Sequence, residues 1–176
     1  RKDGGKLYGR LIQSNRKNQK RTVRTRAWEA QTGGNTVQTL RNKKGFICDM
    51  DGVIYHGNRL LPGVREFVDW LQREKKDFLF LTNNSGKTQR ELQAKLSRMG
   101  LDIDEKHFYT SALATAQFIA TQMPGARAFV IGEPGLLNAL YEQGITFDDV
   151  SPDYVIVGES SSYTYDNICR AVRCVQ

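Results

Sequence analysis

From residue 45 onward, short apolar runs alternate with amphipathic segments, and this alternation limits the chain to few architectures. The apolar runs have the length of buried strands, and the segments between them place apolar residues at helical spacing. Such alternation favours an α/β fold with a parallel sheet and right-handed crossovers. A chain of 176 residues can bury one core and part of a second. The expected strands are residues 46–48, 78–81, 108–109, 128–132 and 154–158.

The expected helices are bounded by residues that favour helix ends. Gly100 follows one apolar helical face, at the C′ position where a left-handed residue is favoured. Thr110 or Ser111 is placed to cap the next helix, and Gly144 to end the one after it. The helices are expected near residues 64–71, 92–99, 111–120, 135–143 and from 165 onward.

Two carboxylates follow the first expected strand. Asp49 and Asp51 stand two residues apart, and Gly52 comes next. Ligands of open α/β sheets bind at the carboxyl ends of the strands, where paired carboxylates need a cation or hydrogen-bond donors to offset their charge. Mg²⁺ is a hard cation that suits both oxygens and a phosphate group. In such a site Asp49 is a candidate nucleophile and Asp51 a candidate proton donor.

Two other interpretations of these carboxylates need no catalysis. The Asp-x-Asp-Gly pattern is favoured in turns, and on these residues alone a simple turn stays open. The segment also resembles the start of a calcium-binding loop. Leu60 occupies position 12 counted from Asp49, where such loops need a bidentate Glu, so this second interpretation is excluded.

A second polar cluster follows the second expected strand. Thr82, Asn83 and Asn84 offer a hydroxyl and two amides, which are uncharged donors suited to the oxygens of an anion. The following Gly-Lys-Thr resembles the end of a P-loop, but Leu81 stands where that motif needs its first glycine. Capping of the next helix is an equally good explanation of the cluster alone. Two polar clusters after two strands favour a shared cleft for phosphoryl transfer.

These motifs resemble those of the haloacid dehalogenase-like phosphatases, and more narrowly the NagD-like branch of ribonucleotide monophosphatases. Asp49-Met50-Asp51-Gly52-Val53 is similar to the first motif of the family, and Leu81-Thr82-Asn83-Asn84 to the second. The resemblance covers essentially residues 45–176. Its further support lies in residues 56–63, 108–116, 130–133 and 153–159.

The resemblance implies a role for each matching residue. Asp49 would form an aspartyl-phosphate and bind Mg²⁺, while Asp51 would act as general acid and then general base, with its backbone carbonyl on the metal. Thr82 and Asn83 would hold the transferring phosphoryl group, and Asn84 and Gly52 are further expected phosphate-binding positions. The substrate implied is a small phosphate ester, in particular a nucleoside monophosphate such as UMP.

The resemblance also implies a domain organisation. Residues 45–124 would form part of a Rossmann-like phosphatase core, and residues 125–176 the start of an inserted α/β cap domain. The last two expected strands would then leave the main sheet, in which the alternation alone would have kept them. The family also has a lysine motif and a later acidic motif beyond the cap, and neither is found before Gln176. We therefore expect an incomplete core with an open sheet edge, and little or no activity from this polypeptide alone.

The positive charge of the chain is concentrated at its start. Residues 1–44 carry 13 Lys and Arg against two acidic residues, a net charge of +11, whereas residues 45–176 carry 13 against 17, a net charge of −4. Residues 1–44 lack the apolar periodicity of a core, which predicts a disordered extension. A solvated tail is favoured over a transit peptide. A nucleic-acid-binding arm, with Tyr8 and Trp28 as stacking groups, is the alternative function.

Other site types are not indicated. Cys48, Cys169 and Cys174 form no C-x-x-C pair, and His56 and His107 have no partner at zinc-ligand spacing. The sequence shows no run of 18 apolar residues and no secretory signal. We therefore expect a cytoplasmic protein without a membrane partner. Nothing in the sequence indicates an oligomeric state.

Overall fold

The computed structural model describes residues 39–176. Residues 1–38, and with them most of the predicted basic extension 1–44, lie outside the described residues. The chain divides into two units, Arg1–Lys43 and Lys44–Gln176. In the described part of the first unit, the amide of Lys43 donates to the carbonyl of Leu40 at 3.0 Å. All the elements below belong to the second unit.

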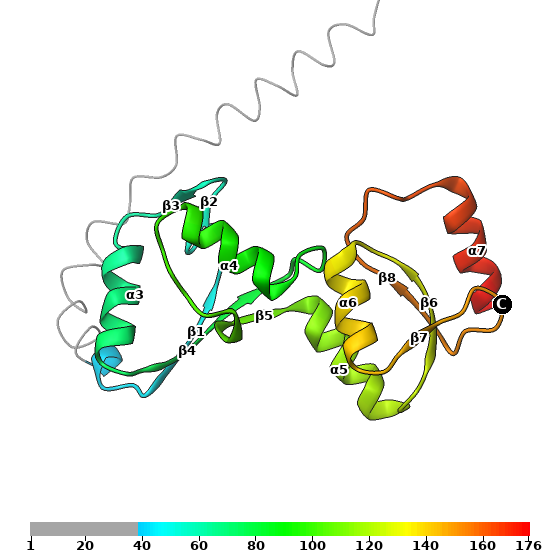
Figure 1. Cartoon of the computed structure of the whole chain (residues 1–176), viewed down its shortest axis with the longest axis horizontal. Coiled ribbons are helices and arrows are strands. Elements are labelled where there is room, and N and C mark those ends of the chain that lie inside the picture. Colours follow the sequence, from blue (N-terminus) through cyan, green and yellow to red (C-terminus); the bar gives the residue numbers. More distant parts are fainter. Residues whose placement is uncertain (1–38) are drawn as a thin grey trace, which may run out of the picture. The chain divides into compact units, whose positions relative to one another are not determined.

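A parallel three-stranded sheet carries both predicted motifs. It consists of β1 (Gly45–Asp49), β4 (Asp77–Thr82) and β5 (Phe108–Thr110), in the order β1-β4-β5 (Figure 1). In its register, Asp49 lies opposite Leu81, and Thr82 lies opposite Thr110. The predicted α/β fold with parallel strands is confirmed.

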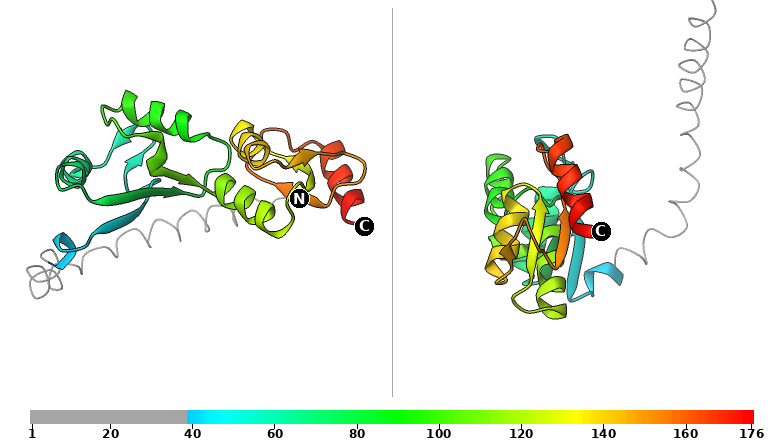
Figure 2. Two further views of the ribbon diagram at one scale, coloured as in Figure 1. Left: turned by 60° about the horizontal axis from the view of Figure 1, so that its bottom comes forward. Right: turned by 90° about the vertical axis from the view of Figure 1, so that its right-hand side faces the viewer.

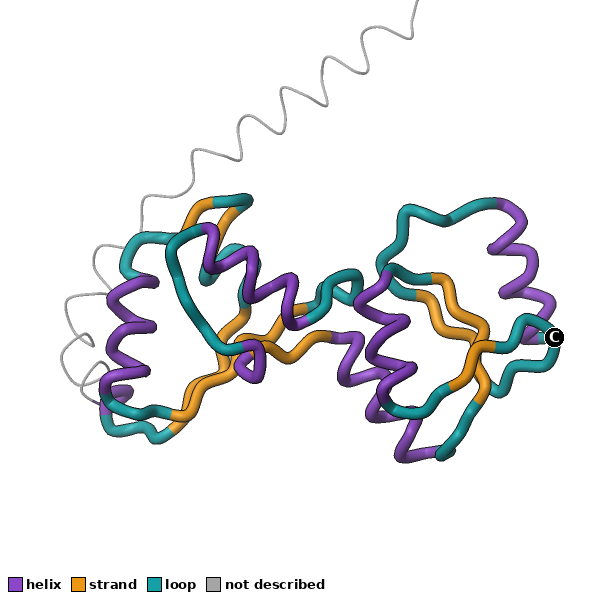
Figure 3. The backbone as a smooth tube through the Cα atoms, viewed as in Figure 1, coloured by secondary structure: helices purple, strands orange, loops and turns teal. Residues whose placement is uncertain are grey.

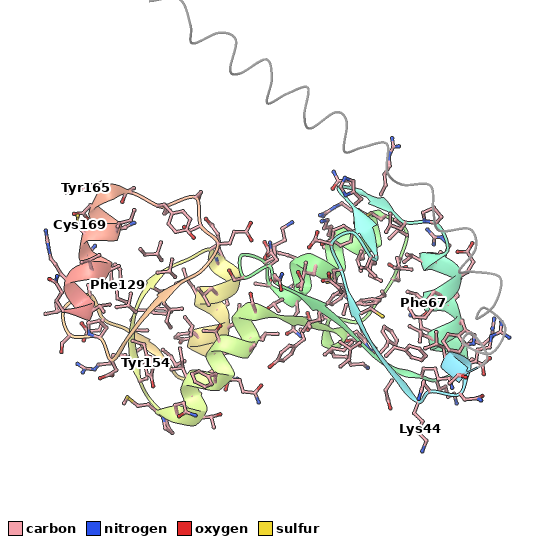
Figure 4. The ribbon with its side chains drawn as sticks, turned by 180° about the vertical axis from the view of Figure 1, so that it is seen from behind. Lys44, Phe67, Phe129, Tyr154, Tyr165 and Cys169 are labelled. Carbon is pink, nitrogen blue, oxygen red and sulfur yellow. The ribbon has the colours of Figure 1, made fainter. Side chains whose placement is uncertain are left out.

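One face of this sheet is covered by two helices, α3 (Val64–Arg73) and α4 (Gln89–Arg98). Along β4 the side chains alternate, so that Phe78, Phe80 and Thr82 are buried. Phe78 and Phe80 pack in one cluster with apolar residues of both helices, which are Val64, Val68, Leu71, Leu92 and Leu96. Phe67 of α3 meets Phe46 edge to face, with ring centroids 5.8 Å apart (Figure 4). The opposite face stays open, with Ile47 74% and Leu81 44% exposed.

Three short elements complete this part of the chain. A hairpin of β2 (Tyr55–His56) and β3 (Arg59–Leu60) follows β1, and a 3₁₀ turn, η1 (Glu105–His107), precedes β5. None of them was predicted, because two or three residues are too few to show a periodicity.

The later strands form a second parallel sheet. Its order is β7-β6-β8, from β7 (Thr146–Phe147), β6 (Arg127–Ile131) and β8 (Tyr154–Val157) (Figure 3). The single five-stranded sheet favoured by the alternation alone is therefore wrong. Periodicity along a strand shows burial, but it does not show which strands are neighbours.

The second sheet has its own core. Helices α5 (Ser111–Gln122) and α6 (Pro134–Glu142) contact each other, and Figure 2 shows them beside the second sheet. Small residues of both helices, Ala112, Ala116 and Ala139, belong to one apolar cluster with Ala128 of β6 and Ile156 of β8. The last helix, α7 (Tyr165–Val175), lies beside β6 and β8. Its Arg170 pairs with Asp149 at 2.5 Å, and the guanidinium carbon lies 5.5 Å from the ring centre of Phe129.

In the part of the chain that the structure describes, no helix combines the length and the apolar character needed to cross a bilayer.

Candidate active site

The two predicted carboxylates lie at the carboxyl end of β1. Asp49 is the last residue of the strand, and its Oδ1 accepts a hydrogen bond from the amide of Met50 at 2.8 Å. Met50 is fully buried in the core, while Asp49 and Asp51 on either side of it are exposed. The buried methionine anchors the segment, so that both carboxylates remain accessible to a ligand.

A tight turn follows the carboxylates. Gly52 has a φ of 79°, a value that favours glycine, and its amide donates to the carbonyl of Tyr55 at 2.8 Å. The amide of Ile54 donates back to Met50 at 2.9 Å. The Gly52 N–H is thus already engaged within the turn. The positive φ of the turn explains why a glycine stands at position 52. Phosphate binding by Gly52 stays a prediction.

Tyr55 is a residue of the site that sequence reasoning missed. Its side chain is buried, and its hydroxyl lies near the Asp51 carboxylate. Burial raises the pKa of Tyr55 to about 12, and the negative charges of Asp51 and Asp49 act in the same direction. Tyr55 thus belongs to the surroundings of both carboxylates.

A lysine lies over the Tyr55 ring. The ammonium of Lys95, on α4, lies 3.6 Å from the ring centre, which is a cation–π contact. Burial lowers the pKa of Lys95, as does the positive charge of Lys87, whereas the charge of Asp51 raises it. Lys95 thus places a positive charge near the carboxylates. Its position depends on the packing of α4 onto the hairpin segment, which no local motif shows.

The second predicted cluster ends the neighbouring strand. Thr82 is the last residue of β4 and is buried, and its Oγ1 accepts a hydrogen bond from the amide of Asn84 at 3.1 Å. The side chain of Asn83 is exposed, and its carbonyl accepts a hydrogen bond from Ser111 Oγ at 2.7 Å. Because Asp49 pairs in register with Leu81, Thr82 and Asn83 lie at the same edge of the sheet as Asp49.

Asn84 is placed differently from its predicted role. Its Nδ2 donates to Glu159 Oε2 at 2.7 Å, and its Oδ1 accepts from the amide of Lys87 at 2.9 Å. Both ends of the side-chain amide are therefore engaged within the protein. Asn84 connects the loop after β4 with the loop after β8, and phosphate binding by Asn84 stays a prediction.

The carboxylate pair has the donor chemistry for Mg²⁺. This ion is usually bound through one or two carboxylates together with water and substrate phosphate oxygens. Asp49 and Asp51 are two exposed oxygen donors, and they fit that description. Within residues 39–176, no group of three or more His, Cys, Asp or Glu side chains forms a site built from protein ligands alone.

The arrangement can therefore support one class of chemistry. Asp49 lies exposed at the end of β1, and Asp51 follows two residues later. The hydroxyl of Thr82 and the amide of Asn83 lie at the end of the neighbouring strand. A nucleophile, a proton donor and anion-binding donors at one edge are the parts that phosphoryl transfer needs.

Sequence comparison identifies a matching family and several relatives of this chain. A family described as haloacid dehalogenase-like hydrolase matches residues 46–146. The ribonucleotide monophosphatase NagD of Escherichia coli K12 is 41% identical over 128 residues, which are 73% of this chain and 51% of NagD. An acid sugar phosphatase of Staphylococcus saprophyticus is 40% identical over 133 residues, or 75% of this chain and 51% of the relative.

Solved structures have the same fold. The structure of NagD from E. coli K-12 superimposes with a TM-score of 0.72 and 41% identity, covering 75% of this chain and 52% of NagD. A glycerol phosphate phosphatase from Mycobacterium tuberculosis, solved in complex with magnesium, gives a TM-score of 0.70 and 25% identity, covering 75% of this chain and 40% of that structure. The chain thus spans about half the length of the curated relatives it matches.

Proposed function

This chain belongs to the haloacid dehalogenase-like hydrolase family, and from that membership we propose that the protein is a Mg²⁺-dependent phosphomonoester hydrolase of the NagD-like type. One observation carries the proposal. Asp49 and Asp51 lie exposed at the carboxyl end of β1, in register with the strand that ends at Thr82. The proposed substrates are nucleoside monophosphates such as UMP, which accords with the name of the NagD relative.

In the proposed reaction, each side chain has one task per step. A carboxylate oxygen of Asp49 attacks the phosphorus, so that a new O–P bond forms while the bond from phosphorus to the ester oxygen breaks. Asp51 gives its proton to the departing alcohol. Water then attacks the aspartyl-phosphate and gives a proton to Asp51, which releases inorganic phosphate and restores the Asp49 carboxylate.

The remaining residues bind and orient. The buried Tyr55, whose hydroxyl lies near Asp51, would help to orient that carboxylate. Thr82 and Asn83 would donate to the phosphoryl oxygens from the end of β4. Bound Mg²⁺, held by Asp49 and Asp51, would neutralise part of the phosphate charge.

We further propose the domain organisation that the family resemblance implies. Residues 45–124 would belong to the phosphatase core and residues 125–176 to a cap. One feature supports the proposal: β1, β4 and β5 form one parallel sheet, and β6, β7 and β8 form another. Helix α5, which lies before residue 125, packs in the apolar cluster of the second sheet.

The test is a pair of matched Asp→Asn substitutions. Any Mg²⁺-dependent hydrolysis of UMP and p-nitrophenyl phosphate, which we expect to be weak in this polypeptide alone, should be lost in Asp49→Asn, because the amide is a poor nucleophile. Asp69→Asn, on the exposed face of α3, is the control and should leave both rates unchanged. Since the chain spans about half of its relatives, the binding of beryllium fluoride, which mimics an aspartyl-phosphate, is a second readout by ¹⁹F NMR. Retained turnover and retained beryllium fluoride binding in Asp49→Asn would refute the assignment.

A further inference from the structure

A cavity of about 310 Å³ adjoins the proposed phosphoryl-binding loop. Its polar wall contains Asn83, Ser111, Thr115 and Glu159. Because Asn83 is proposed to hold the phosphoryl group, the alcohol part of a bound ester would extend into this space. The volume is at the small end of the range for ligand sites, so it suits a compact alcohol.

Glu159 gives this cavity a negative charge. Its Oε2 accepts the hydrogen bond from Asn84 Nδ2 at 2.7 Å, and its backbone amide donates to Ser85 Oγ at 2.9 Å. These two bonds hold the residue in place. Its other oxygen, Oε1, makes no hydrogen bond within residues 39–176, and no Lys or Arg of that range forms an ion pair with Glu159.

The neighbouring hydroxyl groups also present acceptors. Ser111 Oγ donates its proton to the carbonyl of Asn83 at 2.7 Å, and Thr115 Oγ1 donates to the carbonyl of Ser111 at 2.8 Å. Each hydroxyl has therefore used its only proton, and its oxygen lone pairs remain. Among residues 39–176, no cationic side chain lines the cavity. The wall thus accepts hydrogen bonds and has no group that would neutralise an anion.

We propose that Glu159 determines specificity: it selects phosphate esters whose alcohol part carries free hydroxyl groups over esters that carry a second negative charge beside the phosphate. Hydroxyl groups of a polyol or a ribose donate to Glu159 Oε1, whereas a carboxylate at the same place meets a like charge. This inference rests on the proposed function, because it needs the phosphoryl group to lie at Asn83.

The test compares three ligands by calorimetry with Mg²⁺ present. They are inorganic phosphate, glycerol 1-phosphate and 2-phosphoglycolate, and every protein carries Asp49→Asn so that no ligand is consumed. Without further change, the chain should bind glycerol 1-phosphate about tenfold more tightly than 2-phosphoglycolate, the effect of about one like-charge contact at a partly exposed site. Glu159→Gln should remove most of this preference, chiefly by improving the binding of 2-phosphoglycolate.

One control variant separates the local charge at the cavity from the net charge of the chain. Glu66→Gln, on the exposed face of α3, removes the same charge outside the cavity lining and should keep the preference. Binding of inorganic phosphate with an unchanged preference in Glu159→Gln would overturn this inference and leave the proposed function intact. No binding of inorganic phosphate to any variant would overturn the proposed function and this inference with it.

Discussion

Gly135 of α6 lies in close contact with the loop after β4. It is the second residue of the helix and is buried, and its amide donates to the carbonyl of Gly86 at 3.1 Å. A Cβ added at Gly135 would lie 2.6 Å from the carbonyl carbon of Lys87 and 2.7 Å from that of Gly86. These are backbone atoms, which cannot turn aside as a flexible side chain can. Gly135→Ala therefore forces the start of α6 away from the loop that carries Asn84.

The expected magnitude combines two opposing terms. Overpacking of a close contact costs about 1–3 kcal/mol. Replacing glycine by alanine in a helix gains up to about 1 kcal/mol from propensity, and less in the first turn. The net effect on the free energy of unfolding should be a loss of about 1–2 kcal/mol. With a urea m value of about 2 kcal/mol/M, the midpoint of unfolding should fall by about 0.5–1 M.

The assay is urea unfolding followed by circular dichroism, with Gly45→Ala as the matched control. At Gly45 an added Cβ would meet Asp77 at 3.4 and 3.5 Å, which is ordinary contact, so the midpoint should stay close to that of the unchanged chain. A Gly135→Ala midpoint equal to that of Gly45→Ala would refute the close approach of α6 and the loop.

Two further predictions concern individual hydrogen-bonded pairs. Thr88 and Glu91 form a capping box at the start of α4, with Thr88 N donating to Glu91 Oε2 at 2.8 Å and Glu91 N to Thr88 Oγ1 at 3.2 Å. In urea unfolding, Thr88→Ala should lower the free energy of unfolding by about 1 kcal/mol, and Thr88→Ser should lower it much less. Equal losses in the two variants would contradict the capping role. Hydrogen bonds from the side chain and backbone of Arg127 lower the pKa of Asp153 in the folded chain. The unfolded chain therefore binds more protons in acid. The stabilisation that Asp153 gives above its unfolded pKa is lost as the pH falls through its folded pKa. Asp153→Asn should therefore lose less stability than the unchanged chain between about pH 6 and about pH 3, and an identical pH profile would show that Asp153 does not contribute.

The elements that sequence could predict are those set by local signals. The apolar run at residues 78–81 lies within β4, and the expected cap at Thr110 is present, its Oγ1 accepting from the amide of Leu113 at 3.2 Å. The pairing of β6 with β7 and β8 could not be predicted from the alternation, because it depends on contacts between separate segments. The two-residue strand β7 shows no periodicity at all.

The same distinction holds for the candidate site. Asp49 and Thr82 could be placed at strand ends because each directly follows a run of apolar residues. Lys95 and Glu159 could not, because each reaches the site through a contact made by tertiary packing. Tyr55 is near Asp51 along the chain, but no local motif indicates that its side chain is buried beside the carboxylates. The engagement of the Asn84 amide belongs to this second group, since its partner lies 75 residues along the chain.

The position of β1 links the sheet to the chemistry in one more way. Within residues 39–176, β1 pairs only with β4, so one row of its backbone amides and carbonyls has no strand beside it. The strand ends at Asp49. Any strand that adds to this side in parallel must bring its own carboxyl end, and whatever side chains follow it, next to Asp49. A further strand on this side would thus place its own side chains beside Asp49, the proposed nucleophile.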